Sequence, residues 1–409
     1  MRERICRPGI HAPIIGARPV RNLISMPRFS PFHANAFTWS FALGMTHLLI
    51  PLYARELGMS GVAIGSLISL PVLGQIWCNL LGGAYADRIG AKPTSLIACV
   101  LTMVAAAIFA TSANYLGLLA GQVTMMLSRA AFWPSNWALA SRLPGDRSRN
   151  MGRLNATTDS GNIVGVALTG AVIAQLGFRT GFWIMLGVGF LSFLFSIFIA
   201  PHPTTNAARP ALFAIYRVLL KRRGIHFSVL CAYISALPVS LSVSFFPILL
   251  VEQGFSSQTT GLLLALRAVG SITAGFALAQ LVRSAADRAP PLACALLAAV
   301  CVGLVALFPH PLWAGSVLLG LGLGSGLMTV YFQILISSVS LAEQRGSAMA
   351  LGSLGYALSH LSAPLIVGSL ADAYGIHAAL YAFGLIVLTI GLTIPAVQRW
   401  AFRNGNRPL

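Results

Sequence analysis

Five ionisable side chains stand well inside apolar stretches of the sequence: His47, Arg129, Asp159, Arg267 and His360. An ionisable group is costly within a membrane, so its presence there indicates a functional site. Asp159 could exchange a proton, the arginines could attract an anionic group, and the histidines could relay protons near neutral pH. We therefore take these five residues as candidates for a substrate or ion pathway.

Each candidate also has a structural alternative. At 1.5 Å per helical residue, Arg129 lies about 16 Å and Asp159 about 9 Å from their shared loop, so the two could form an ion pair between adjacent helices. Arg267 could instead extend to the outer membrane interface. A histidine inside a membrane could be a hydrogen-bonded packing residue.

Uncharged polar and aromatic side chains extend the candidate pathway: Gln75, Asn79, Gln122, Trp133, Asn136, Asn162, Tyr233, Tyr331, Gln333 and Tyr356. Such groups also hold membrane helices together, and hydropathy alone does not fix which way each one faces. The sequence contains no Walker loop and no evident catalytic triad or metal-ligand cluster. We therefore expect neither an enzyme nor a metal site, and no cofactor.

The composition identifies the surroundings of these residues. Of the 409 residues, 56% are hydrophobic and 9% are charged, whereas about a quarter of residues are charged in soluble domains. Such a chain cannot cover itself with a soluble surface. The composition excludes disordered and collagen-like chains and indicates a polytopic membrane protein.

Twelve apolar runs are long enough to span a membrane as helices. They are 31–53, 61–86, 93–112, 115–140, 154–176, 180–200, 225–251, 259–282, 290–308, 311–338, 347–371 and 376–398. This predicts an all-α integral membrane protein with a basic tail (1–30), a six-helix bundle (31–200), a central loop (201–224), a second six-helix bundle (225–398) and a C-terminal tail (399–409). Met26 could be the true start.

The basic residues are distributed by loop. Of the 27, 23 lie in the two tails and in alternate loops, and the opposite loops hold only Arg55 and Arg179. This bias predicts that both termini are cytoplasmic. The formal net charge of +18 therefore reflects topology, because a nucleic-acid site would gather charge on one face. In the central loop, the spacing of Leu212, Ile215, Tyr216 and Leu219 suggests an interfacial helix, with a solvated basic linker as the alternative.

The two halves contain an internal repeat. Six residues from Pro51 to Gly74 match Pro247 to Gly270 at an offset of 196, and four from Arg147 to Gly177 match Arg345 to Gly375 at 198. Because six spans restore the starting side, the halves have the same orientation. Parallel six-span repeats are typical of a transporter architecture.

The loop between the second and third spans reads Gly83-Ala-Tyr-Ala-Asp87-Arg88-Ile-Gly90-Ala-Lys92. It resembles the signature of the major facilitator superfamily, Gly-x-x-x-Asp-Arg-x-Gly-x-Arg/Lys, with Ala91 where a second basic residue is usual. The resemblance implies two six-helix bundles whose spans 1, 2, 4, 5, 7, 8, 10 and 11 line a cavity. It also implies that this loop latches the bundles in the outward-open state.

The fifth span contains Gly161-x-x-x-Gly165-x-x-x-x-Gly170. This resembles the antiporter motif of the same family, although Val166 and Thr169 replace a proline and a glycine. The alternative is a small-residue face for close helix packing.

The sequence thus predicts a secondary transporter, resembling drug or metabolite efflux members, that works by alternating access between the two bundles. We expect proton-coupled efflux of a small organic molecule. The alternatives are a proton-coupled importer of a small nutrient, which could be anionic, and a non-transporting membrane sensor. We expect a monomer that lies in a plasma membrane, namely the bacterial inner membrane. Its expected partners are lipid and a small molecule, and we expect no nucleic-acid partner.

Overall fold

The computed structural model describes residues 30–144, 146–200, 212–282, 284–341 and 345–403, with the backbone alone at 79–89, 147–148, 212–215, 278–279 and 345–346. Every regular element within these residues is a helix, as the sequence predicts. The predicted basic tail lies outside the described residues except for Ser30, and so does much of the central loop and of the C-terminal tail.

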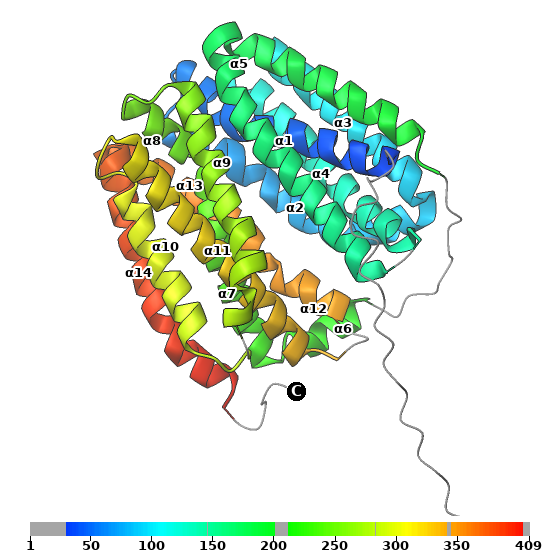
Figure 1. Cartoon of the computed structure of the whole chain (residues 1–409), viewed down its shortest axis with the longest axis vertical. Coiled ribbons are helices and arrows are strands. Elements are labelled where there is room, and N and C mark those ends of the chain that lie inside the picture. The colour runs from blue at the N-terminus through cyan, green and yellow to red at the C-terminus, as the bar shows by residue number, and fades with distance from the viewer. Residues whose placement is uncertain (1–29, 145, 201–211, 283, 342–344, 404–409) are drawn as a thin grey trace, which may run out of the picture. The chain divides into compact units, whose positions relative to one another are not determined.

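The first bundle contains five helices: α1 (Pro31–Glu56), α2 (Gly61–Ile89), α3 (Ala91–Thr111), α4 (Tyr115–Arg142) and α5 (Arg147–Ile197). α5 is two successive helices, because its backbone leaves the helical region at Gly177, with φ 77° and ψ 173°. This break lies between the predicted spans 154–176 and 180–200. α1 packs along α5, and α3 packs against α4 (Figure 1).

After α6 (Leu212–Leu219), the second bundle contains α7 (Arg223–Ser242), α8 (Phe246–Glu252), α9 (Ser257–Thr273), the short π-helix η1 (Ala274–Leu278), the 3₁₀-helix η2 (Ala279–Leu281), α10 (Ala289–Leu304), α11 (Pro311–Val339), α12 (Arg345–Gly352), α13 (Leu354–Tyr374) and α14 (Ile376–Ala401). α6 lies in the predicted central loop. In it, Leu219 is buried among residues of the second bundle, and Tyr216 packs against the same cluster.

Three predicted spans of the second bundle are interrupted. The span 225–251 divides into α7 and α8 because Pro247 has no N–H for the carbonyl of Val243 and its ring crowds that carbonyl. The span 259–282 passes from α9 into a π-helix, and 347–371 divides at Ser353. Hydropathy does not detect these breaks, because the residues around them stay apolar.

The sequence repeat corresponds to a repeated local structure. Gly58 and Gly254 have φ of 73° and 89°, and Gly177 and Gly375 have φ of 77° and 80°. Positive φ strongly favours glycine, so each pair marks the same turn in both bundles. The two halves are therefore alike in backbone conformation at these turns as well as in sequence.

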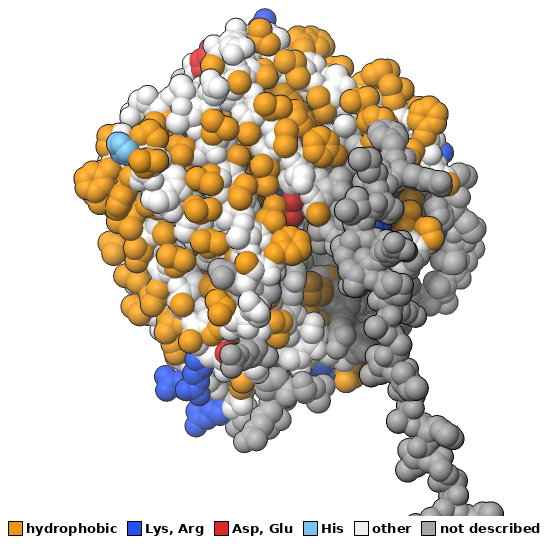
Figure 2. All heavy atoms as spheres, viewed as in Figure 1, with side chains coloured by type: hydrophobic (Ala, Val, Ile, Leu, Met, Phe, Trp, Pro, Cys, Tyr) orange, Lys and Arg blue, Asp and Glu red, His pale blue; other side chains and the backbone are white. Residues whose placement is uncertain are grey.

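The outer surface fits a lipid environment. Among the described residues, eight helices are long and apolar enough to cross a membrane. One of these eight lies within α5 and is 49 residues long. Large apolar side chains are exposed, such as Trp77 (67%), Phe198 (71%), Phe276 (80%) and Leu312 (79%). Figure 2 shows hydrophobic side chains spread across the visible described surface. The total of twelve spans stays a prediction.

Candidate functional site

A cavity of about 320 Å³ lies where the two bundles face one another. Its walls come from α1, α2, α4 and α5 of the first bundle and from α7, α9 and α13 of the second. These correspond to the predicted spans 1, 2, 4, 5, 7, 8 and 11. The tenth span, α11, contributes no lining residue.

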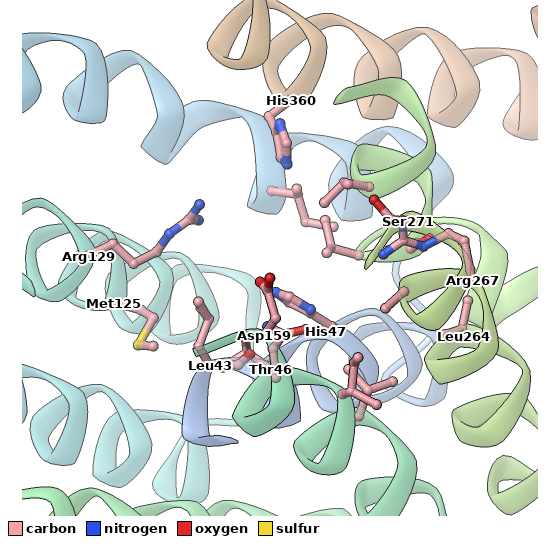
Figure 3. Close-up of a pocket in the computed structure, with 18 of the residues that line it drawn as sticks. Leu43, Thr46, His47, Met125, Arg129, Asp159, Leu264, Arg267, Ser271 and His360 are labelled. Atoms are coloured by element: carbon pink, nitrogen blue, oxygen red, sulfur yellow. Dashed lines mark hydrogen bonds between the residues drawn. The ribbon is translucent and has the colours of Figure 1, made fainter. Parts of the chain in front are cut away.

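All five ionisable candidates line this cavity. Arg129 lies on α4, Asp159 on α5, His47 on α1, Arg267 on α9 and His360 on α13. Figure 3 shows Arg129 and Arg267 on opposite sides of the pocket, with His47 and Asp159 between them in this view and His360 reaching in from α13. The five groups thus come from both bundles and meet at one site.

Arg129 and Asp159 do not form an ion pair. Among the described side chains, an ion pair joins Arg55 to Glu252. Arg129 and Asp159, in contrast, do not approach within the 4.0 Å of a salt bridge. Asp159 is instead an exposed residue on the cavity wall. The carboxyl group can therefore exchange a proton with solvent in the cavity without first breaking a salt bridge.

Arg267 is buried, with 8% of its surface exposed. Its Nε and Nη1 atoms have no hydrogen-bond partner among the described residues, and the same holds for Nε of Arg129. A side chain that extended to the outer membrane interface would be exposed. The buried position of Arg267 therefore contradicts the alternative that this side chain extends to that interface.

Glycines set the position of α9. A Cβ atom on Gly322 of α11 would overlap the backbone carbonyl of Arg267, and one on Gly326 would overlap the carbonyl of Ser271. Small residues let membrane helices approach closely. The backbone that carries Arg267 therefore rests directly on α11.

The glycines of the fifth span also make close helix contacts. A Cβ atom on Gly161 or Gly165 would overlap the carbonyl of Phe37 or Phe41 on α1, and one on Gly170 would overlap Ser257 of α9. The small-residue interpretation of this motif accounts for these contacts. They also hold Asp159, two residues before Gly161, close to α1.

Several uncharged candidates join the charged ones. Gln75, Gln122, Trp133 and Asn162 line the cavity. Sequence reasoning missed other polar lining residues, namely Thr46, Ser242 and Ser271. Ser271 follows Arg267 by one helical turn, and this i, i+4 spacing could have revealed it.

Other candidates lie away from the cavity lining. The Asn136 amide donates to the carbonyl of Phe132 (3.0 Å), and the Tyr331 hydroxyl donates to the carbonyl of Ala285 (2.7 Å). Tyr233 is within hydrogen-bond distance of Ser362 (3.0 Å) and Tyr356 of Thr329 (3.4 Å), while Gln333 is exposed. Asn79 lies outside the described side chains.

Part of the predicted latch motif can be described. Gly90 has φ 98° before α3, and the Lys92 ammonium donates to the carbonyl of Ile197 at the end of α5 (2.7 Å). Lysine is favourable at a helix C-terminus, where carbonyls lack partners. For Gly83, Asp87 and Arg88 the structure describes the backbone alone.

The two bundles approach each other closely at the helix ends that the sequence predicts to be external. A Cβ on Gly61 or Gly65 of α2 would overlap the backbone of α13 at Gly368 or Pro364. In the other half of the repeat, Gly170 of α5 makes the equivalent contact with α9. The two bundles are therefore in direct backbone contact at this end through two glycine-mediated helix pairs.

Comparisons with known proteins agree with this architecture. A fragment of the chain is 27% identical over 171 residues to the quinolone resistance protein NorA of Staphylococcus aureus, which is 41% of this chain and 44% of NorA. Another is 26% identical over 231 residues to the multidrug resistance protein MdtH of Proteus mirabilis, 56% of this chain and 57% of MdtH. The match thus spans about half the length of these relatives.

Solved structures share the fold. A bacterial homolog of the human lysosomal transporter Spinster, inward-facing and unoccupied, superposes with a TM-score of 0.74 at 14% identity, over 90% of this chain and 95% of that one. The nucleoside transporter NupG gives 0.75 at 13% identity, over 90% and 98%. The sequence model of the Major Facilitator Superfamily matches residues 33–359. The chain belongs to the Major Facilitator Superfamily, a family of membrane transporters rather than enzymes.

Proposed function

We propose that the protein is a secondary transporter that exports a small organic solute in exchange for protons, by alternating access to the central cavity. The observation that carries the proposal is the cavity between the two bundles, which five ionisable side chains line and near whose predicted external end the bundles are in direct contact. Its volume of about 320 Å³ lies at the lower end of the range of small-molecule sites, about 300–1,000 Å³. Parallel bundles with a site at their interface suit rocking of one bundle against the other.

Asp159 supports the proton coupling. It is the one acid among the described lining residues, and it forms no ion pair there. Its charge can therefore change with the pH of the side to which the cavity opens. Efflux as the direction is supported by NorA and MdtH, which are named for quinolone resistance and multidrug resistance. The loop distribution of basic residues supports a plasma-membrane location with both termini cytoplasmic, and we take the chain as a monomer.

The test begins with a screen of small organic compounds, quinolones included, for thermal stabilisation of the purified protein, because a ligand of the folded state raises its stability. Each compound that stabilises is then followed into inverted membrane vesicles with an imposed pH gradient. Uptake that needs an acidic interior and stops with a protonophore supports proton-coupled efflux. Uptake in the opposite orientation alone indicates an importer, and binding without flux indicates a sensor.

A further inference from the structure

We infer that the transported solute carries an anionic group, of the carboxylate kind, bound between Arg129 of α4 and Arg267 of α9, and an apolar body. This inference rests on the proposed transport function and names its substrate class. Its starting point is the charge of the cavity. The described lining contains two arginines and one aspartate, together with His47 and His360. With Asp159 ionised and the histidines neutral, one positive charge remains, and protonation of Asp159 leaves two.

The arginines have unused donors. Nε and Nη1 of Arg267 and Nε of Arg129 are buried and lack hydrogen-bond partners among the described residues. A buried unpaired charge is unfavourable unless a partner satisfies it. A carboxylate matches the planar donor fork of a guanidinium, and this pairing is stronger than a neutral hydrogen bond. The cavity therefore offers donors that an anion would satisfy and a neutral or cationic solute would not.

The rest of the lining is largely apolar. Leu43, Ile68, Met125, Met126, Trp133 and Ile272 face the same space. Bare inorganic anions would leave this surface without a partner, whereas an aromatic or aliphatic carboxylate would bury it favourably. The two features together point to an amphipathic organic anion.

The two arginines belong to different bundles. When Asp159 is protonated and the cavity holds no anionic solute, their positive charges repel each other across it, which favours separation of the bundles. An anion between them replaces this repulsion by attraction to both. Binding would thus favour states in which the bundles close around the solute, because a ligand shifts an equilibrium by its differential affinity.

The experiment uses matched probes with the purified full-length protein: 1-naphthoate, octanoate and further aryl and alkyl carboxylates, each with its neutral amide and its ammonium analogue. We expect the acids to bind at least about tenfold more tightly than the amides, a difference of about 1.4 kcal/mol. Arg267→Gln and Arg129→Gln should each remove this preference by weakening acid binding much more than amide binding. Arg267→Lys should restore part of it, because lysine keeps the charge and loses the fork.

Arg179→Gln is the matched control, because it removes an exposed arginine that lies outside the cavity, just after the break at Gly177, and should leave the preference unchanged. Three results would overturn the inference: no carboxylate of the series binds, the amides or ammonium analogues bind as tightly as the acids, or Arg267→Gln weakens acid and amide equally. Flux in vesicles separates the two proposals. Acid binding without flux contradicts transport alone, and flux of a neutral or cationic solute without acid binding contradicts the anionic substrate alone.

Discussion

The Asp372 carboxylate accepts a hydrogen bond from the backbone N–H of Gly61 at 2.5 Å, and its second oxygen accepts from Val62 at 2.8 Å. Asp372 lies near the end of α13 and Gly61 begins α2, so the bond joins the two bundles at the predicted external end. The first N–H groups of a helix lack partners within it and carry partial positive charge. The position that the repeat equates with Asp372 is Ala174, so only one of the two equivalent interfaces has this carboxylate.

We expect Asp372→Asn to open the external end more often. The amide keeps the shape of the side chain and loses the charge, and a charge at a helix N-terminus contributes about 0.3–2 kcal/mol, or about 1.7- to 30-fold in population. The measurement is the rate at which a membrane-impermeant thiol reagent, added from outside, labels a cysteine introduced at Leu43 in a background free of native cysteines.

Asp146→Asn is the control for this variant. Asp146 caps α5 through the N–H of Arg149 (2.7 Å), within one bundle. Its replacement removes a similar bond without touching the contact between bundles. Equal labelling of the Asp372→Asn variant and the parent protein would show that this carboxylate does not hold the external end closed.

A second external contact between the bundles should matter less. Arg55 and Glu252 form an ion pair of 2.6 Å, with side chains 54% and 34% exposed. Exposed pairs contribute little and are screened by salt. We expect Glu252→Gln to raise labelling at position 43 less than Asp372→Asn does, and the difference from the parent to vanish at high salt. A larger effect than that of Asp372→Asn would reverse this ranking.

Asp159→Asn should abolish flux driven by a pH gradient. Asparagine keeps the size of the side chain and cannot exchange a proton, so the cavity would have the same charge whichever side it faces. The measurement compares flux of a bound solute with and without the gradient in vesicles. Asp146→Asn serves as the control, because it removes an acid that lies outside the cavity and outside the contact between the bundles. Flux of the Asp159→Asn variant that still follows the gradient as in the parent would contradict the proton role.

The fold was predictable from the sequence because two patterns determine it. Apolar runs mark the helices, and glycines at fixed offsets mark the equivalent turns, as Gly58 and Gly254 do. The interruptions at 243–245 and at η1 were not predictable from hydropathy. A break in a helix changes backbone geometry and leaves apolar composition unchanged, although Pro247 gave a local signal.

The site was predictable in part, and charge decided which part. The five ionisable candidates line the cavity, because charged groups are costly against lipid or in an apolar core. Uncharged groups can be satisfied inside a bundle, as Tyr331 is by the carbonyl of Ala285. Helix rotation decides between these two environments, and rotation depends on packing between helices that hydropathy does not report. The roles of the lining residues stay predictions.

Gly322→Ala should destabilise the protein and disturb the site together. The added methyl group would meet the backbone carbonyl of Arg267, so α9 would have to move away from α11, and such overpacking costs about 1–3 kcal/mol. Gly187→Ala is the control, since a Cβ there meets no atom within 4 Å and alanine favours a helix by up to about 1 kcal/mol. Thermal unfolding in detergent should show a lower Tm for Gly322→Ala and an equal or higher Tm for Gly187→Ala, with solute affinity reduced only in the former. Equal Tm and affinity in both variants would mean that α9 does not depend on this contact for its position.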